Sequence, residues 1–231
     1  MTVQGLDERL AAVAAFVPLG ACLADIGADH AKLPLALATK GKIARAIAVD
    51  VNEGPFEAAR RAVRAAGLAR LVEVRLGDGL AALAPGEVDA VAVAGMGGSS
   101  ITRILADGAA VLQAVETLVL QPQGDAAELR AWLYDNGWHI AEESLVRAGG
   151  RLYEVLLARR GKKEKPEPVL LAIGPRLWQE KPPLLKKHIE GLLFRVRRAR
   201  AGMEKSARAR DGAAYRALGE KIAALEEKLI W

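Results

Sequence analysis

The chain has 231 residues, 52% of them apolar, and a net charge of +5 at neutral pH. This apolar content is ample for a buried core, so the composition excludes a largely disordered chain. The single cysteine excludes an internal disulfide, and no apolar run is long enough to span a bilayer. Because the first residues also lack the pattern of an export signal, we expect a cytoplasmic protein that does not enter a membrane.

Apolar runs alternate with helical patterns over the first two thirds of the chain. An amphipathic helix is predicted at 6–17, and strands are predicted at 21–26, 43–49, 71–76, 88–94 and 117–120. Helical patterns follow the first, second, fourth and fifth of these strands. Two further runs, 138–146 and 152–158, flank a glycine turn and read as a hairpin. The order predicts an α/β fold with a mostly parallel, Rossmann-like sheet covered by helices and an antiparallel hairpin at its edge.

A charged, proline-containing stretch at 161–168 predicts a boundary between a domain over 1–161 and a second over 162–231. Beyond it, apolar residues recur at steps of three and four in two segments. They are Leu185, Ile189, Leu192, Val196, Ala199 and Met203, then Tyr215, Leu218, Ile222, Leu225 and Leu229. Because residues 210–212 can turn the chain, we expect a C-terminal α-helical antiparallel coiled coil.

Positive charge is concentrated in the first of these two segments. Residues 186–210 contain nine Lys or Arg and two Glu, so this segment carries more than the net charge of the whole chain. A solvated helix face is one explanation, and contact with a polyanion is the other. Charge alone leaves both open.

Carboxylates stand at the ends of the first three predicted strands: Asp25, Asp50 and Asp78. Because the carboxyl ends of parallel strands share one edge of a sheet, we expect these acids along one edge. An adenosyl ligand would supply donors to all three: ribose hydroxyls to Asp50, the adenine amine to Asp78, and a tail ammonium near Asp25. Gly27 would allow its close approach to the backbone. Helix capping, the alternative, explains any one of the acids but not the set.

A dinucleotide is a poor candidate for this edge. The first turn has Ala28, Asp29 and His30 after Gly27 in place of G-x-G-x-x-G spacing, and a carboxylate there would repel a pyrophosphate. The chain also lacks a G-x-x-x-x-G-K loop. S-adenosylmethionine, whose sulfonium is cationic, suits an acidic edge better.

Six short motifs resemble, in order, those of the bacterial TrmK family of tRNA (adenine-N1)-methyltransferases that act on adenine 22. They are Asp25-Ile-Gly-Ala-Asp-His30, Gly54-Pro-Phe56, Gly77-Asp-Gly79, Ala94-Gly-Met-Gly-Gly98, Leu120-Gln-Pro122 and Leu152-Tyr-Glu-Val155. The resemblance covers residues 5–160 and implies a class I methyltransferase sheet, S-adenosylmethionine as methyl donor, tRNA as substrate and a C-terminal coiled-coil domain. The family pattern has Asn where this chain has Gln123.

The expected chemistry is in-line attack of adenine N1, whose lone pair is free at neutral pH, on the sulfonium methyl. We expect Asp29 and His30 to act beside the reacting base, although Asp29 could instead cap the following helix. The expected cofactor contacts are Asp25, Gly27, Asp50, Val51, Asp78, Gly79, Ala94, Gly95 and Met96. The expected substrate contacts are Gly97, Gln121, Pro122, Arg195, Arg197, Arg198 and Arg200.

No spacing of His, Cys, Asp or Glu indicates a metal, and we expect a monomer. Two other functions stay open. The same sheet could serve a methyltransferase for another RNA or a small molecule, because fold does not decide substrate. The coiled coil could also be the working part of a non-catalytic RNA-binding or partner-binding protein.

Overall fold

The computed structural model describes residues 5–204, 210 and 212–230. The chain divides into two compact units, Met1–Lys165 and Pro166–Trp231. Within the described residues, no helix has the length and apolar character needed to cross a bilayer.

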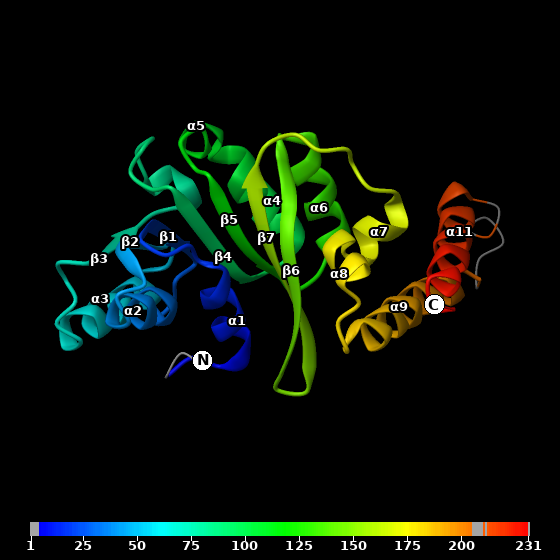
Figure 1. Cartoon of the computed structure of the whole chain (residues 1–231), viewed down its shortest axis with the longest axis horizontal. Coiled ribbons are helices and arrows are strands. Elements are labelled where there is room, and N and C mark those ends of the chain that lie inside the picture. Colours follow the sequence, from blue (N-terminus) through cyan, green and yellow to red (C-terminus); the bar gives the residue numbers. More distant parts are fainter. Residues whose placement is uncertain (1–4, 205–209, 211, 231) are drawn as a thin grey trace. The chain divides into compact units, whose positions relative to one another are not determined.

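The N-terminal unit is built on one sheet with the strand order β3-β2-β1-β4-β5-β7-β6 (Figure 1). Strands β1 to β5 run parallel, whereas β7 is antiparallel to β5 and β6 is antiparallel to β7. The predicted parallel sheet and its edge hairpin are therefore confirmed. The strands are β1 (Ala21–Ile26), β2 (Ile43–Asp50), β3 (Val72–Leu76), β4 (Ala90–Met96), β5 (Thr117–Pro122), β6 (Trp138–Ala148) and β7 (Arg151–Arg160).

Helices cover both faces of this sheet, because alternate residues of each strand enter different cores. Leu23 of β1 joins one core, with apolar residues of α1 (Glu8–Phe16), α2 (Lys32–Thr39) and α3 (Glu53–Ala65). Ala24 and Ile26 join the other core, with α4 (Gly98–Asp107), α5 (Ala109–Leu112) and α6 (Ala126–Asp135). The short 3-10 helix η1 (Gly79–Ala82) follows β3. This three-layer arrangement is why the parallel strands are apolar on both faces.

Apolar residues alternate along β3 at Val72, Val74 and Leu76, a pattern that predicts all three in the core, yet Leu76 is 47% exposed. It ends β3, which is the edge strand next to β2 and therefore has a neighbour on one side only. Burial on β3 is complete only at its first residue, Val72.

A buried ion cluster attaches the edge hairpin to α6. The fully buried Arg130 guanidinium of α6 pairs with Glu143 of β6 at 2.7 Å and with Glu154 of β7 at 2.5 Å. Removing one member of such a buried cluster leaves an uncompensated charge, which is strongly destabilising. The hairpin is therefore fixed by charge as well as by strand pairing.

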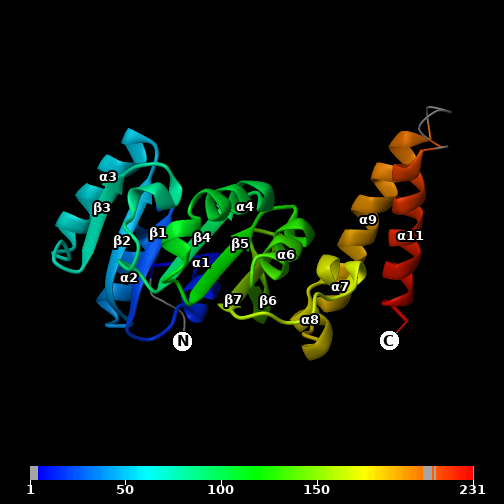
Figure 2. The same cartoon turned by 90° about the horizontal axis from the view of Figure 1, so that it is seen from above.

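The C-terminal unit is helical, with α7 (Pro168–Ile173), α8 (Pro175–Glu180), α9 (Leu185–Met203) and α11 (Ala213–Glu227). The long helices α9 and α11 lie side by side and run in opposite directions, as predicted (Figure 2). Part of the expected turn, Asp211, lies outside the described residues. The short helices α7 and α8 were not predicted, and the His188 ring of α9 hydrogen-bonds the Ile173 carbonyl of α7 at 3.0 Å.

One residue of the predicted apolar stripe is exposed. Ala199 is exposed, whereas Ile189 and Val196 of the same helix are buried. At this level of the helix pair the contact with α11 is made by Arg200, whose guanidinium lies 4.5 Å from the centre of the Tyr215 ring. A long side chain with an apolar stem replaces the expected small one.

Candidate active site

Two carboxylates lie side by side at the carboxyl ends of β1 and β2. Asp25 and Asp50 are 5% and 7% exposed, and strand alternation places both on the face of the sheet covered by α1, α2 and α3. This point is next to the boundary between β1 and β4, where the chain order of the sheet reverses. Such switch points are where open α/β sheets bind ligands.

Asp25 differs from Asp50 in its hydrogen bonds. The Asp50 carboxylate accepts from the backbone N–H groups of Asp29 (3.2 Å) and Asn52 (3.0 Å). Among the described residues, the Asp25 carboxyl has no hydrogen-bond partner. Burial, and to a lesser extent the charge of Asp50, raise the pKa of Asp25 to about 7. A buried carboxyl without a protein donor is a group that a cationic or hydrogen-bond-donating ligand can satisfy.

The turn between β1 and α2 has a strained backbone. Asp29 and Ala31 both have positive φ, at 51° and 52°, and Gly27 has a φ of 73°. Residues other than glycine adopt this conformation at a cost of about 1–2 kcal/mol each, and such strain is concentrated at functional sites. The N-terminal cap of α2 is Ala31, with no side-chain hydrogen bond. The alternative reading of Asp29 as the helix cap is therefore wrong.

Asp29 and His30 are presented to solvent beside this turn. Their side chains are 63% and 54% exposed, and the His30 Nε2 lies 3.6 Å from the Asp29 carboxylate. Both groups are accessible to a ligand. Neither is held by the core.

The third predicted acid lies at the end of β3. Asp78 is exposed, it precedes η1, and its side chain makes no capping hydrogen bond. The next residue, Gly79, has a φ of 55°, and Val51, which follows Asp50, is 59% exposed. Asp25, Asp50 and Asp78 thus end three adjacent strands, β1, β2 and β3, and we call them the acidic rim. Helix capping explains none of the three.

The Met96 side chain lies against the β1–α2 turn. A Cβ atom at Gly27 would be 2.2 Å from the Met96 Cε, so the end of the Met96 side chain occupies the space that the glycine leaves open. Met96 and its neighbours Ala94 and Gly95 are partly buried. The end of β4 therefore meets the end of β1 at the predicted cofactor site.

The loops after β4 and β5 are joined by backbone hydrogen bonds. The Gln123 N–H donates to the Met96 carbonyl at 2.8 Å, and the Gly98 N–H donates to the Gly124 carbonyl at 2.9 Å. Gly97 is the N-terminal cap of α4. The two loops therefore form one connected surface beside the acidic rim.

The buried side chain of Gln121 lies beneath this surface and holds its backbone in place. Its side chain is fully buried, and its Oε1 accepts from the Arg9 guanidinium at 2.8 Å and from the Gly95 N–H at 3.1 Å. Its Nε2 donates to the Pro122 carbonyl at 2.9 Å. Direct contact of Gln121 or the buried Pro122 with substrate, as predicted, does not fit this burial. Gln121 instead fixes the backbone of Gly95.

Arg9 is the residue that sequence analysis missed at this site. The helical pattern at 6–17 places Arg9 away from the apolar face, yet its guanidinium reaches Gln121 on β5 and would lie 3.6 Å from a Cβ atom at Gly95. Nothing in the helical pattern distinguishes it from a solvated arginine. Only the packing of α1 near the ends of β4 and β5 brings it here.

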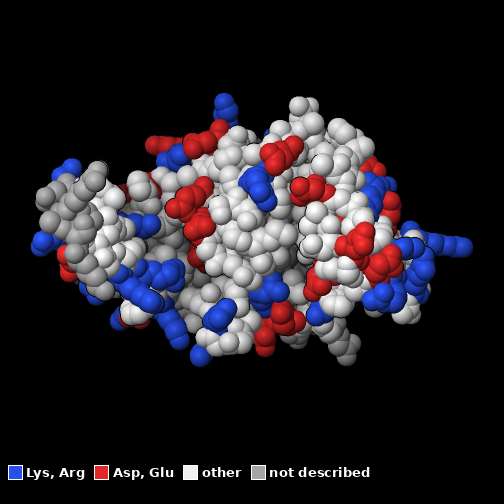
Figure 3. Space-filling model, turned by 180° about the vertical axis from the view of Figure 1, so that it is seen from behind, with Lys and Arg blue, Asp and Glu red and all other residues white. Residues whose placement is uncertain are grey.

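The predicted basic residues of α9 have different environments. Arg195 and Arg198 are exposed and form no ion pair with any described residue. Arg197 donates to Glu226 of α11 at 2.5 Å, and Arg200 packs over Tyr215. Figure 3 shows basic side chains gathered around the C-terminal helices, at the left of the view. The two unpaired arginines are the best placed of the four to bind an anion.

No group of three or more His, Cys, Asp or Glu side chains suited to a metal ion occurs in the described part of the chain.

Comparisons with known proteins identify a family. Residues 23–227 match the family model TrmK, described as tRNA (adenine(22)-N(1))-methyltransferase. The tRNA (adenine(22)-N(1))-methyltransferase of Bacillus subtilis is 40% identical over 181 residues, which are 76% of this chain and 76% of that protein.

Solved structures agree in fold over nearly the whole chain. A putative tRNA (m1A22) methyltransferase of Streptococcus pneumoniae has a TM-score of 0.88 at 38% identity, and the match covers 97% of this chain and 99% of that one. The same S. pneumoniae protein in complex with S-adenosyl-L-methionine has a TM-score of 0.86 at 37% identity, with the same coverage. The B. subtilis TrmK structure has a TM-score of 0.89 at 33% identity over 97% of this chain and 98% of that one.

Proposed function

The chain belongs to the TrmK family of tRNA (adenine(22)-N(1))-methyltransferases, and from this membership we propose that it methylates N1 of adenine 22 in tRNA with S-adenosylmethionine as donor. The observation that carries the proposal is the buried Asp25 carboxyl, which has no partner among the described residues and lies beside Asp50. Relatives named as this enzyme, and the S. pneumoniae relative solved with S-adenosyl-L-methionine, support the same assignment.

The acidic rim fits the donor groups of this cofactor. Asp50 is placed to accept from the ribose hydroxyls, Asp78 to accept from the adenine amine, and Asp25 to balance the positive charge of the methionyl end. The remaining expected contacts are Gly27, Val51, Gly79, Ala94, Gly95 and Met96. When bound, the cofactor supplies an electrophilic methyl group on a sulfonium.

The residues of the chain then act on the base. Adenine N1 needs no deprotonation to become nucleophilic, so the protein must chiefly place it in line with the methyl group and exclude water. The methylated ring is cationic, and the accessible carboxylate of Asp29, with His30 beside it, can stabilise that charge. Because N1 lies on the pairing edge, the base must leave its stack before it can react.

We assign the two units different parts of this task. The N-terminal unit binds the cofactor, and the C-terminal unit, through exposed arginines such as Arg195 and Arg198, binds the tRNA backbone. A tRNA substrate implies work in the cytoplasm. The monomeric state expected from the sequence stays a prediction.

Methyl transfer to whole tRNA transcripts tests the proposed function. We expect labelled methyl from S-adenosylmethionine to be found at N1 of adenine 22, and to be absent when guanine replaces that adenine. Methylation at another position, or equal transfer to both transcripts, would overturn the assignment of substrate. Tight cofactor binding without transfer to any RNA would instead favour a small-molecule methyltransferase.

A further inference from the structure

The Phe194 ring stands exposed on the basic helix α9. It is 67% exposed, whereas Leu193 and Val196 of the same helix are 4% and 8% exposed. Phe194 therefore contributes little to the packing of α9 in this unit. Single exposed apolar side chains are common, so the surroundings of the ring decide its meaning.

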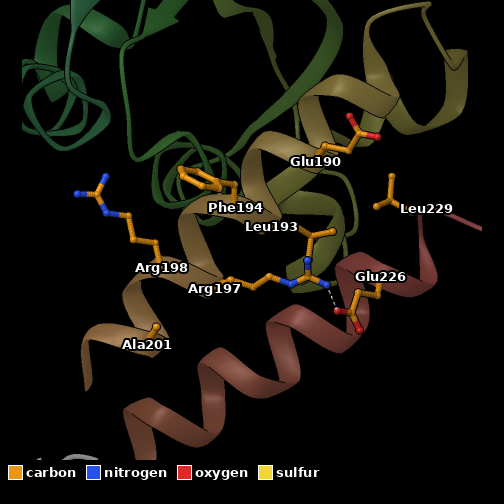
Figure 4. Close-up of a pocket in the computed structure, with 8 residues that line it drawn as sticks. All are labelled: Glu190, Leu193, Phe194, Arg197, Arg198, Ala201, Glu226 and Leu229. Atoms are coloured by element: carbon orange, nitrogen blue, oxygen red, sulfur yellow. Dashed lines mark hydrogen bonds and ion pairs between the residues drawn. The ribbon is translucent and has the colours of Figure 1, made fainter. Parts of the chain in front are cut away.

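Phe194 lines a groove between α9 and α11. The groove has a volume of about 500 Å³, and Leu193, Ala201 and Leu229 form the rest of its apolar lining. Figure 4 shows the Phe194 ring and the Arg198 side chain projecting from α9, while Arg197 reaches across to Glu226 on α11. The aromatic ring and Arg198 lie at the outer margin of this groove, on the side of α9 that faces away from α11, and the groove is large enough for a planar heterocycle.

The charged residues around this groove differ in whether they are paired. Arg197 and Glu226 neutralise each other through their hydrogen bond, and Glu190 is the other acidic residue of the lining. Arg198, in contrast, has no acidic partner among the described residues. Outside the Arg197–Glu226 pair, the lining thus carries one guanidinium, Arg198, and one carboxylate, Glu190. An apolar surface beside the Arg198 guanidinium suits a ligand that is planar and uncharged at one end and anionic at the other. A nucleotide within an RNA strand has this character.

We propose that the α9 margin of this groove, formed by Phe194 and Arg198, binds one unpaired nucleotide of the tRNA, with its base stacked on Phe194 and an adjacent phosphate held by Arg198. The proposal rests on the proposed function, because it assumes that tRNA is the substrate. Stacking on an exposed aromatic ring is how proteins hold splayed bases with little regard to sequence, and guanidinium groups bind phosphate oxygens with charge-assisted hydrogen bonds.

Charge favours RNA over a second copy of the chain as the occupant. Helix α9 carries six Lys or Arg and one Glu, so an approaching polyanion is attracted along its length. A second copy of the chain would bring the same positive helix towards this one, and like charges would oppose the contact.

Binding of whole tRNA to the full chain tests the site. We expect Phe194→Ala to raise the dissociation constant for tRNA about 5- to 150-fold, which is the effect of losing one stacked base. Phe194→Trp, which keeps a stacking surface, should bind within about threefold of the parent protein. The matched control is Leu19→Ala, which removes a side chain that is 83% exposed on the N-terminal unit and should change nothing.

The salt dependence separates stacking from loss of a phosphate contact. Phe194→Ala should leave the slope of log affinity against log salt concentration unchanged. Arg198→Gln should reduce the magnitude of this slope by about one unit, the amount expected for one lost phosphate contact. The cofactor affinity and the thermal midpoint should stay at parental values in all four variants.

Three results would overturn the proposal: parental tRNA affinity in Phe194→Ala, equal weakening in Phe194→Ala and Phe194→Trp, or a loss of self-association on size-exclusion chromatography with tRNA binding intact. These failures are distinguishable from failure of the proposed function. If the proposed function is wrong, the parental protein itself does not methylate adenine 22.

Discussion

Asp25 is a buried acid that has no hydrogen-bond partner among the described residues. Its pKa is raised to about 7, from an ordinary value of 3.8, mainly by burial and secondly by the charge of Asp50. The folded protein therefore keeps a proton on Asp25 over a pH range in which the unfolded chain has lost it. Stability must then fall as the pH rises from about 4 to about 7, and level off above that range.

Asp25→Asn removes this pH dependence. We expect the free energy of unfolding of the variant, relative to the parent protein, to increase by about 3 kcal/mol between pH 5 and pH 8. Urea unfolding of the cofactor-free protein at the two pH values measures it. A constant difference between the two proteins would show that Asp25 is already ionised in the fold at pH 5.

Gln121 and Gln123 differ in what their side chains do. Gln121→Ala deletes three hydrogen bonds at a fully buried position and leaves the Gly95 N–H without its acceptor, so we expect a loss of about 2–3 kcal/mol and a slower methyl transfer. Gln123→Ala is the control. Its exposed side chain is removed, while the backbone N–H that bonds the Met96 carbonyl remains. Equal stability of the two variants in urea unfolding would contradict the supporting role of Gln121.

At the scale of elements, the start of α4 depends on the absence of a side chain. A Cβ atom at Gly98 would lie 2.5 Å from the Asp125 carbonyl oxygen and 2.7 Å from that of Gly124, both backbone atoms that cannot move without opening the loop after β5. The connected surface beside the acidic rim is built on this contact.

We expect Gly98→Ala to destabilise the protein by about 1–3 kcal/mol, the usual effect of overpacking, and to reduce methyl transfer. Gly202→Ala is the matched control, because a Cβ atom at this position of helix α9 would meet nothing within 4 Å and no proline follows it. It should be neutral or stabilising by up to about 1 kcal/mol, since alanine is the better helix former. Thermal unfolding compares the pair, and a neutral Gly98→Ala would refute the packing argument.

The helix α9 carries two kinds of arginine. Arg198→Glu should lower tRNA affinity more than Arg197→Glu, because the charge of Arg197 is already paired with Glu226 whereas that of Arg198 is free among the described residues. The difference should shrink as salt rises, and cofactor affinity should not change. Filter binding across a salt series provides the measurement. If the tRNA affinity of both variants did not depend on salt, α9 would not be part of the tRNA-binding surface.

At the scale of the molecule, the fold was predictable where burial is periodic. The parallel strands are buried on both faces, so each leaves an unbroken apolar run, and β1 was predicted with its observed bounds. The short helices α7 and α8 were missed because six residues with prolines leave no helical period.

The candidate site was predictable only in part, for a similar reason. The acidic rim follows from chain order, because parallel strands end together. The burial of Gln121, its bond to Arg9 and the packing of Arg200 over Tyr215 depend on contacts between distant segments. A single sequence carries no local signal for such contacts. At these places the structure gives Gln121 and Arg200 packing and hydrogen-bond contacts that the sequence did not predict.

We propose that the chain buries the Asp25 carboxyl, at a cost in stability, to bind a cationic adenosyl cofactor. Titration of S-adenosylmethionine into Asp25→Asn at pH 8, with the exposed Asp107→Asn on α4 as control, tests it most directly. We predict that Asp25→Asn binds the cofactor about 10- to 150-fold more weakly than the parent protein, although it is the more stable protein, while Asp107→Asn binds as the parent does. Cofactor binding by Asp25→Asn at parental affinity would contradict the claim.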